Sequence, residues 1–251
     1  IIPSSDPHLS EYPADRWKSR EWISGFTGSA GTIVVTADKA GLWTDSRYFL
    51  QAASQLEGSG IELYKLALPE TPSITEFLLH ELHAGQAVGR EGQTYSAAEA
   101  SALANKLNRK EIKLDTSADL IEGIWKDRPA VPGNPIFEMP EALSGASVHE
   151  KLDLINNQLR SEGADCLILA ALDEIAWTFN IRGTDVTYNP VVVSYAFVSE
   201  DESVLFIKPE KLTAEITEHL KKEGVTLAEY SMIQRYLSRL PENSRVFVDM
   251  N

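Results

Sequence analysis

One short stretch of the sequence places an acid, a base and an aromatic side chain together. Asp45, Arg47 and Tyr48 follow the apolar residues 41–44 and open an expected helix. An arginine in the first turn of a helix opposes the helix dipole, so it needs a nearby partner, which Asp45 can supply. Two interpretations stay open: a local salt bridge with Asp45, or a planar guanidinium offered to a carboxylate or carbonyl group of a ligand.

Other residues that could do chemistry do not form a recognisable site. His80 and His83 are three residues apart, whereas the HExxH zinc motif spaces its histidines by four. We expect both at the solvated end of a helix, where the dipole favours them. The glycine-rich residues 25–31 lack the lysine of a phosphate-binding loop and precede a strand, so they predict a tight turn.

The remaining acids and the cysteine also have structural explanations. Asp173 and Glu174 are adjacent, so their carboxylates point in different directions on a helix, and Asp173 is expected to cap it. Cys166 lies in an apolar run and is expected in the core. No serine stands in a GxSxG motif. The residues alone therefore indicate no catalytic set, no metal ligands and no cofactor loop.

Charge and hydropathy narrow the range of partners. The 251 residues include 23 Lys and Arg against 37 Asp and Glu, a net charge of −14. Nucleic acid needs a basic stripe that this sequence lacks, so the acidic residues form either a solvated surface or a face for basic proteins. No apolar run approaches the ~18 residues of a membrane span. One cysteine allows no internal disulfide, which fits a reducing compartment.

The elements expected along the chain occur twice in the same order. Each copy has a strand, a tryptophan-bearing helix, two strands across an acidic turn, and then helix, strand, helix and strand. The proline-rich residues 126–145 separate the copies as a linker. The second copy stops at Asn251, and the first lacks the leading helix of residues 148–161, so we expect a piece of a longer protein. Each copy predicts a mixed sheet flanked by helices.

Several ordered motifs carry a resemblance to a known family. They are IIPSSDPHLSEY, SGFTGSAGTIVVT, GLWTDSRYFLQA, IWKDRP and ALDEIAWTFNIRGTDVTYNPVVVSYAFV. The chain resembles the N-terminal part of X-prolyl aminopeptidase (aminopeptidase P) in its long, three-domain form. The resemblance implies an α/β fold of two similar creatinase/prolidase N-terminal-type domains, ribonuclease H-like, at residues 1–125 and 146–251. The second would be truncated at its C-terminus, and the catalytic pita-bread domain would be absent.

The same resemblance implies a function for the parent protein. Members are hydrolases that remove an N-terminal residue preceding proline, using two manganese or similar divalent ions held by the absent domain. This chain would then carry no catalytic or metal residue and would be inactive alone. It would shape the substrate cleft and assist assembly of a cytoplasmic homodimer. Arg47 would help to wall the substrate site with support from Asp45 and Tyr48, while Trp43 lies either nearby or in the core.

A second hypothesis belongs to another class of function. The same fold occurs in a subunit of a histone chaperone, and a net charge of −14 suits a basic partner. The chain could therefore be a stand-alone module that binds peptides or basic proteins. The first hypothesis predicts a metal-ligating domain after Asn251, whereas the second predicts a stop or an acidic tail.

Overall fold

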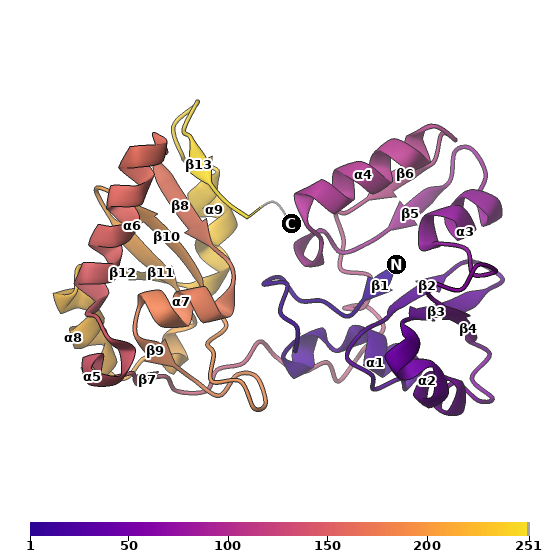
Figure 1. The fold of residues 1–251 in the computed structure, drawn as a ribbon, viewed down its shortest axis with the longest axis horizontal. Helices are drawn as coiled ribbons and strands as arrows, with labels where there is room; N and C mark the ends of the chain where they lie inside the picture. Colours follow the sequence, from indigo (N-terminus) through magenta and orange to yellow (C-terminus); the bar gives the residue numbers. More distant parts are fainter. Residues whose placement is uncertain (250–251) are drawn as a thin grey trace. The chain divides into compact units, whose positions relative to one another are not determined.

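The computed structural model describes residues 1–249, which divide into two compact units, Ile1–Ala130 and Val131–Asp249 (Figure 1). In each unit, helices pack on a sheet of parallel and antiparallel strands. Residues 126–145, expected as a linker, contain β7 (Phe137–Glu138) and α5 (Glu141–Ser144). The domain limits 1–125 and 146–251 stay a prediction.

The first unit is built on a sheet with the order β1-β2-β3-β4. The β1–β2 and β2–β3 pairs are antiparallel and β3–β4 is parallel, so β1 runs in the same direction as β3. A parallel pair, β5–β6, lies beside β1, because the nitrogen of Ile1 donates to the carbonyl of Gly89 at 2.8 Å. The elements are β1 (Ile2–Pro3), η1 (Asp15–Trp17), α1 (Ser19–Ser24), β2 (Thr32–Val35), β3 (Ala40–Thr44), η2 (Ser46–Tyr48), α2 (Phe49–Gln55), β4 (Glu62–Lys65), α3 (Ile74–Glu81), β5 (Ala87–Gly89), η3 (Gly92–Thr94), α4 (Ala97–Asn108) and β6 (Lys113–Asp115).

Strand β2 shows why this sheet has a core on both faces. Its β-branched residues favour a strand, and neighbouring side chains point to opposite faces. Ile33 packs with Phe26 and residues of α1 and α2, whereas Val34 packs with Trp43 and residues of α3 and α4. The turn after β2 is closed by a hydrogen bond from Thr36 N to Lys39 O at 2.8 Å, as expected for two strands joined by an acidic turn.

The second unit repeats this sheet with the order β12-β11-β10-β8-β13. The pairs β8–β10 and β10–β11 are antiparallel and β11–β12 is parallel, which matches the four strands of the first unit pair by pair. The expected duplication is therefore confirmed. The remaining elements are α6 (Val148–Glu162), β8 (Cys166–Leu169), α7 (Leu172–Thr178), β9 (Ile181–Arg182), β10 (Tyr195–Ser199), β11 (Ser203–Phe206), η4 (Pro209–Lys211), α8 (Ala214–Lys222), β12 (Val225–Ala228), η5 (Tyr230–Met232), α9 (Ile233–Leu237) and β13 (Val246–Phe247).

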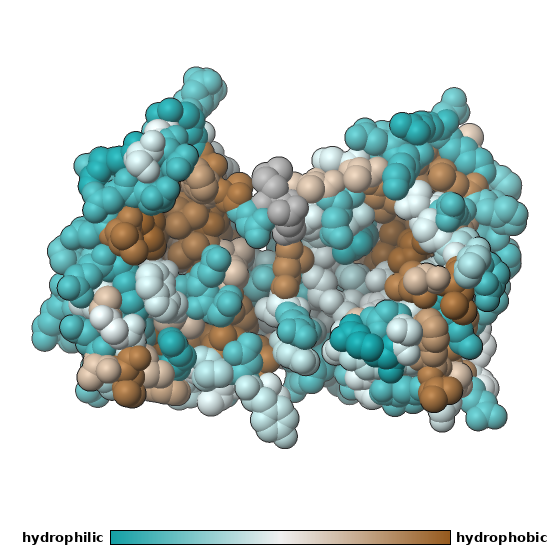
Figure 2. Space-filling view, viewed as in Figure 1, coloured by the Kyte–Doolittle hydropathy of each residue, from teal (hydrophilic) through white to brown (hydrophobic). Residues whose placement is uncertain are grey.

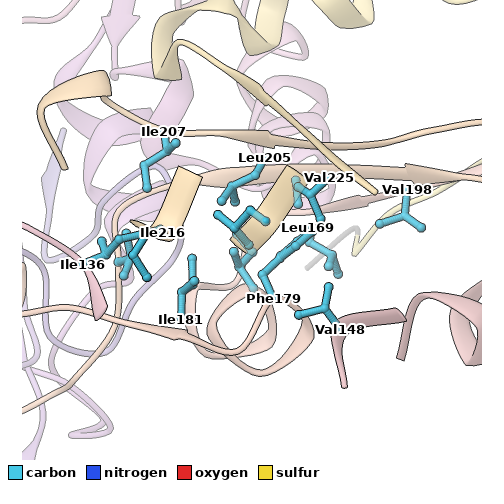
Figure 3. Close-up of a cluster of buried hydrophobic side chains, with 14 of the residues drawn as sticks. Ile136, Val148, Leu169, Phe179, Ile181, Val198, Leu205, Ile207, Ile216 and Val225 are labelled. Atoms are coloured by element: carbon cyan, nitrogen blue, oxygen red, sulfur yellow. The ribbon is translucent and has the colours of Figure 1, made fainter. Parts of the chain in front are cut away.

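The larger core of this unit lies between the sheet and three helices. Val148 of α6, Phe179 after α7 and Ile216 of α8 meet the strands in one buried apolar cluster (Figure 3). On the other face, Phe197 and Phe206 pack against α9. Helix α6 begins at a capping box in which Ser147 and Glu150 bond each other's backbone, which fixes its first turn.

Two helix predictions are wrong in detail. Asp173 does not cap α7, because the N-cap is Ala171 and the helix starts one residue before Asp173, where Leu172 is buried. Helix α7 therefore begins without a side-chain cap, and Asp173 lies in its first turn, where a negative charge is favoured by the helix dipole. The apolar spacing of this tryptophan-bearing helix places Trp177 on its apolar face, but the side chain is 44% exposed. The last strand expected in the second copy falls on residues 245–250; the structure shows β13 at Val246–Phe247, and Met250 lies outside the described residues.

Candidate functional site

The Asp45–Arg47 pair lies where β3 ends. Asp45 is the N-cap of η2, with extended backbone, and its Oδ1 accepts a hydrogen bond from Arg47 N at 3.0 Å. Asp45 therefore caps the helical turn that follows and is also the partner that the sequence predicted for Arg47. The cap places the Arg47 side chain at the carboxyl edge of the sheet, the edge at which open α/β sheets bind ligands.

Arg47 and Asp45 form a two-point ion pair. Arg47 Nε donates to Oδ1 at 2.9 Å and Nη2 donates to Oδ2 at 2.8 Å. These bonds from Arg47 hold the pKa of the Asp45 carboxyl below its usual range and raise the pKa of Arg47. Arg47 remains 63% exposed, and its Nη1 makes no hydrogen bond within residues 1–249. The salt bridge is thus present, and it leaves one edge of the guanidinium available.

Tyr48 connects this pair to the glycine-rich loop. Its hydroxyl lies 2.7 Å from Ser29 Oγ, and its ring meets Phe26 edge to face at a centroid distance of 5.9 Å. The Arg47 guanidinium carbon lies 5.1 Å from the centre of the Tyr48 ring. Tyr48 therefore packs between Arg47 and the loop.

Arg20 holds the glycine-rich loop in place through two of the loop's carbonyl groups, a role that the sequence did not predict. It is only 6% exposed and donates to the carbonyls of Phe26 at 2.9 Å and Gly28 at 2.5 Å. Its guanidinium also lies over the Phe26 ring, at 4.8 Å. Burial lowers the pKa of Arg20. Nothing in the local sequence distinguishes it from a surface arginine, because its partners are loop carbonyls.

A groove of about 830 Å³ adjoins Arg47 in the first unit. Ser5 and Arg90, which follow β1 and β5, line it together with Arg47, which follows β3. Ser29 lines it as well, whereas Asp45 and Tyr48 do not. Of the three predicted site residues, Arg47 thus lines the groove. Asp45 and Tyr48 do not line it, but both contact Arg47.

The other sequence candidates lie elsewhere or serve packing. Trp43 is buried and stacks on Tyr64 at 4.0 Å, so it belongs to the core. Cys166 is buried as expected, and His80 lies at an exposed helix end as expected. Within residues 1–249, no group of three or more His, Cys, Asp or Glu side chains could hold a metal ion. The metal ions implied by the resemblance therefore have no ligand set in this part of the chain.

Comparison with known proteins identifies the family to which these two units belong. Residues 8–124 and 127–251 each match the creatinase/prolidase N-terminal domain. The chain belongs to the creatinase/prolidase N-terminal domain family. The two matches, taken with the repeated sheet, show that both units are copies of this domain.

Relatives of this two-domain creatinase/prolidase chain are much longer proteins. Aminopeptidase P2 of Arabidopsis thaliana is 41% identical over 243 residues, which cover 96% of this chain and 34% of that protein. The Xaa-Pro aminopeptidase ApepP of Drosophila melanogaster is 38% identical over 230 residues, which cover 91% of this chain and 37% of that protein. The chain therefore spans about a third of the curated relatives it matches.

A solved structure agrees with these matches. X-prolyl aminopeptidase from Caenorhabditis elegans, described as a cytosolic enzyme with a di-nuclear active site, superposes with a TM-score of 0.90 at 32% identity. The match covers 94% of this chain and 39% of that one. No helix within residues 1–249 is long and apolar enough to cross a membrane.

Hydrophilic residues cover most of the face of the creatinase/prolidase chain in view (Figure 2).

Proposed function

We propose that this chain is the N-terminal, non-catalytic part of a metal-dependent Xaa-Pro aminopeptidase. Such an enzyme removes the N-terminal residue of a peptide whose second residue is proline. The names of relatives that are 38% to 41% identical support this proposal. In the same proposal, two manganese or similar divalent ions lie in a further domain, where they would activate a water and polarise the carbonyl of the peptide bond that is cleaved.

The observation that carries the proposal is the placement of Arg47. Its guanidinium is held at two points by Asp45, is mostly exposed, lines the groove and keeps Nη1 free within the described residues. A guanidinium in this state donates well to a peptide carbonyl or carboxylate. Arg47 therefore acts in substrate binding, as one wall of the cleft.

Asp45 and Tyr48 act by positioning Arg47. The carboxylate fixes the plane of the guanidinium, and Tyr48 supports it through its ring and its contact with Ser29. A side chain that is already ordered loses less conformational entropy when the peptide binds. The parent enzyme would be a cytoplasmic homodimer, in which this chain assists assembly.

The test uses the protein expressed from its complete reading frame and loaded with manganese. Arg47→Ala should lower kcat/KM for an Xaa-Pro peptide roughly 5- to 150-fold. This corresponds to about 1–3 kcal/mol of lost transition-state stabilisation, the scale of a lost charged hydrogen bond. Arg109→Ala is the matched control, because Arg109 is exposed, ends α4 and does not line the groove. Unchanged kinetics for Arg47→Ala would assign Arg47 to the salt bridge alone.

The alternative function gives a different result in the same assay. If the manganese-loaded protein cleaves no Xaa-Pro peptide, the enzyme proposal fails. The stand-alone module would then be tested by binding to a basic protein such as a core histone, as a net charge of −14 predicts.

A further inference from the structure

The groove beside Arg47 is larger than one arginine contact requires. Its volume of about 830 Å³ lies in the upper part of the range of roughly 300–1,000 Å³ that is usual for ligand sites. Loops after β1, β3 and β5 contribute to it, and so does helix α4. Along α4, Glu99, Ala102, Leu103 and Lys106 line it, spaced as one face of a helix.

Arg90 gives the groove a fixed positive charge. Its guanidinium carbon lies 3.4 Å from the centre of the Tyr95 ring, and Nη2 donates to Thr94 O at 3.2 Å. Its Nε is buried and has no hydrogen-bond partner within residues 1–249. No carboxylate of the described residues lies within ion-pairing distance of Arg90. The stacked ring therefore holds an arginine that has no direct ion-pair partner within the described residues, although Glu99 acts on it electrostatically.

Lys106 adds a second positive charge from α4. It is exposed and lines the groove, and it interacts with Glu76 electrostatically rather than through a direct ion pair within the described residues. Two carboxylates, Glu11 and Glu99, also line the groove, so its charge is mixed. With Arg47 included, the lining has three side-chain cations against these two anions, in a protein with a net charge of −14.

We propose that this groove binds the C-terminal part of the peptide substrate. The N-terminal part of the same peptide would extend past Arg47, out of the groove and toward the proposed metal site. Arg90 and Lys106 bind the terminal carboxylate of that peptide. The inference rests on the proposed function and adds a substrate class: short free peptides with an unblocked C-terminus. Two cations without ion-pair partners suit a carboxylate, and a protein of overall negative charge would otherwise repel an anionic peptide end.

Direct binding tests this without any catalytic step. The 251-residue chain is labelled with ¹⁵N and titrated with peptides of increasing length that begin Ala-Pro, each as the free acid and as the C-terminal amide. We expect the longer free acids to shift the amide signals of Ser29, Arg90 and Thr94, and to bind about tenfold more tightly than the amides. Equal affinity for acid and amide would overturn the proposal.

Two variants and a control locate the carboxylate. Lys106→Gln and Arg90→Gln should each weaken the free acid about tenfold and leave the amide unchanged. Arg109→Gln should change neither, because Arg109 is exposed and lies outside the groove. Lys106 is exposed, so its variant keeps the fold even where Arg90→Gln loosens the Tyr95 stack. Unchanged affinity in Lys106→Gln and Arg90→Gln would overturn the assignment.

The same data separate this inference from the proposed function. If the protein from the complete reading frame cleaves Xaa-Pro peptides but shows no preference for a free C-terminus, the groove assignment is wrong and the enzyme proposal stands. If the chain binds free acids through Lys106 yet the complete protein cleaves none, the groove assignment stands and the enzyme proposal is wrong.

Discussion

Lys211 binds Asp185 inside the second unit, with exposed side-chain fractions of 0% and 1%. The Asp185 Oδ2 that accepts from Lys211 also accepts from Val193 N at 2.7 Å. This pair joins η4 to the loop before β10. A buried charge that loses its partner is costly, because neither water nor another charge then compensates it.

Lys211→Met should therefore lower the free energy of unfolding by about 3–5 kcal/mol. Adding Asp185→Asn to Lys211→Met should cost less than the sum of the two single changes, because the second removes the charge that the first leaves unpaired. Chemical unfolding of the chain measures both. Lys222→Met on the exposed side of α8 is the control, and a Lys211→Met cost equal to that of the control would contradict the argument.

Tyr64 should make the stability of the first unit sensitive to alkaline pH. Burial, aided by its hydrogen bond to Glu62 at 2.9 Å, raises the pKa of Tyr64 to about 12. The pKa of tyrosine in the unfolded chain is about 10, so the unfolded state releases this proton first. The contribution of Tyr64 is then complete below about pH 10 and is lost as the pH rises to about 12.

Tyr64→Phe should flatten that alkaline decrease while preserving the stack on Trp43. The free energy of unfolding, measured at about pH 9 and about pH 11, gives the slope for each protein. Tyr12→Phe is the control, because Tyr12 is more than half exposed. An equal slope in wild type and Tyr64→Phe would show that Tyr64 does not carry the effect.

Gly28 should not accept a side chain. A Cβ at this position would lie 2.3 Å from Phe26 Cζ and 2.7 Å from Tyr48 Cδ1, so both packed rings would have to move. Gly28→Ala should cost about 1–3 kcal/mol of stability, the usual cost of overpacking. It should also weaken peptide binding, because Tyr48 supports Arg47.

Gly123→Ala provides the matched comparison for Gly28. A Cβ at Gly123 meets no atom within 4 Å, so this change should be close to neutral. Thermal unfolding ranks the two variants. If they lose the same stability, contact with Phe26 and Tyr48 is not the reason for the glycine at position 28.

Binding of manganese and manganese-dependent peptidase activity should distinguish this chain from the longer enzyme proposed as its parent. We expect the 251-residue chain to bind no manganese stoichiometrically and to cleave no Xaa-Pro peptide, because its described residues offer no ligand cluster. Isothermal titration measures the first and a peptidase assay the second. Turnover by the purified chain that persists after chelation would refute this.

The order of helices and strands along the chain and the Asp45–Arg47 contact could be predicted because both depend on residues that are near each other in sequence. The carboxylate of Asp45 accepts from the backbone nitrogen of Arg47, only two residues away. The β-branched residues of β2 are consecutive in the sequence, so the strand can be recognised from them alone. The groove could not be predicted, because Arg47 and Arg90 meet the same space only through packing of distant segments. The role of Asp173 was predicted wrongly, because an acidic residue suits both the N-cap and the first turn of a helix, and the structure places Asp173 in the first turn.

The pairing of strands in the sheets also bears on the order in which parts of the chain fold. Hairpins β2–β3 and β10–β11 join strands that are close in sequence, so their loops close at low entropic cost. Strand β13 instead pairs beside β8, where Arg245 bonds to Asp165 across 80 residues. Local contacts form early and distant ones late. We therefore expect each hairpin to form early and β13 to join its sheet late, and we expect the amide hydrogens of β13 to exchange faster than those of β10 and β11.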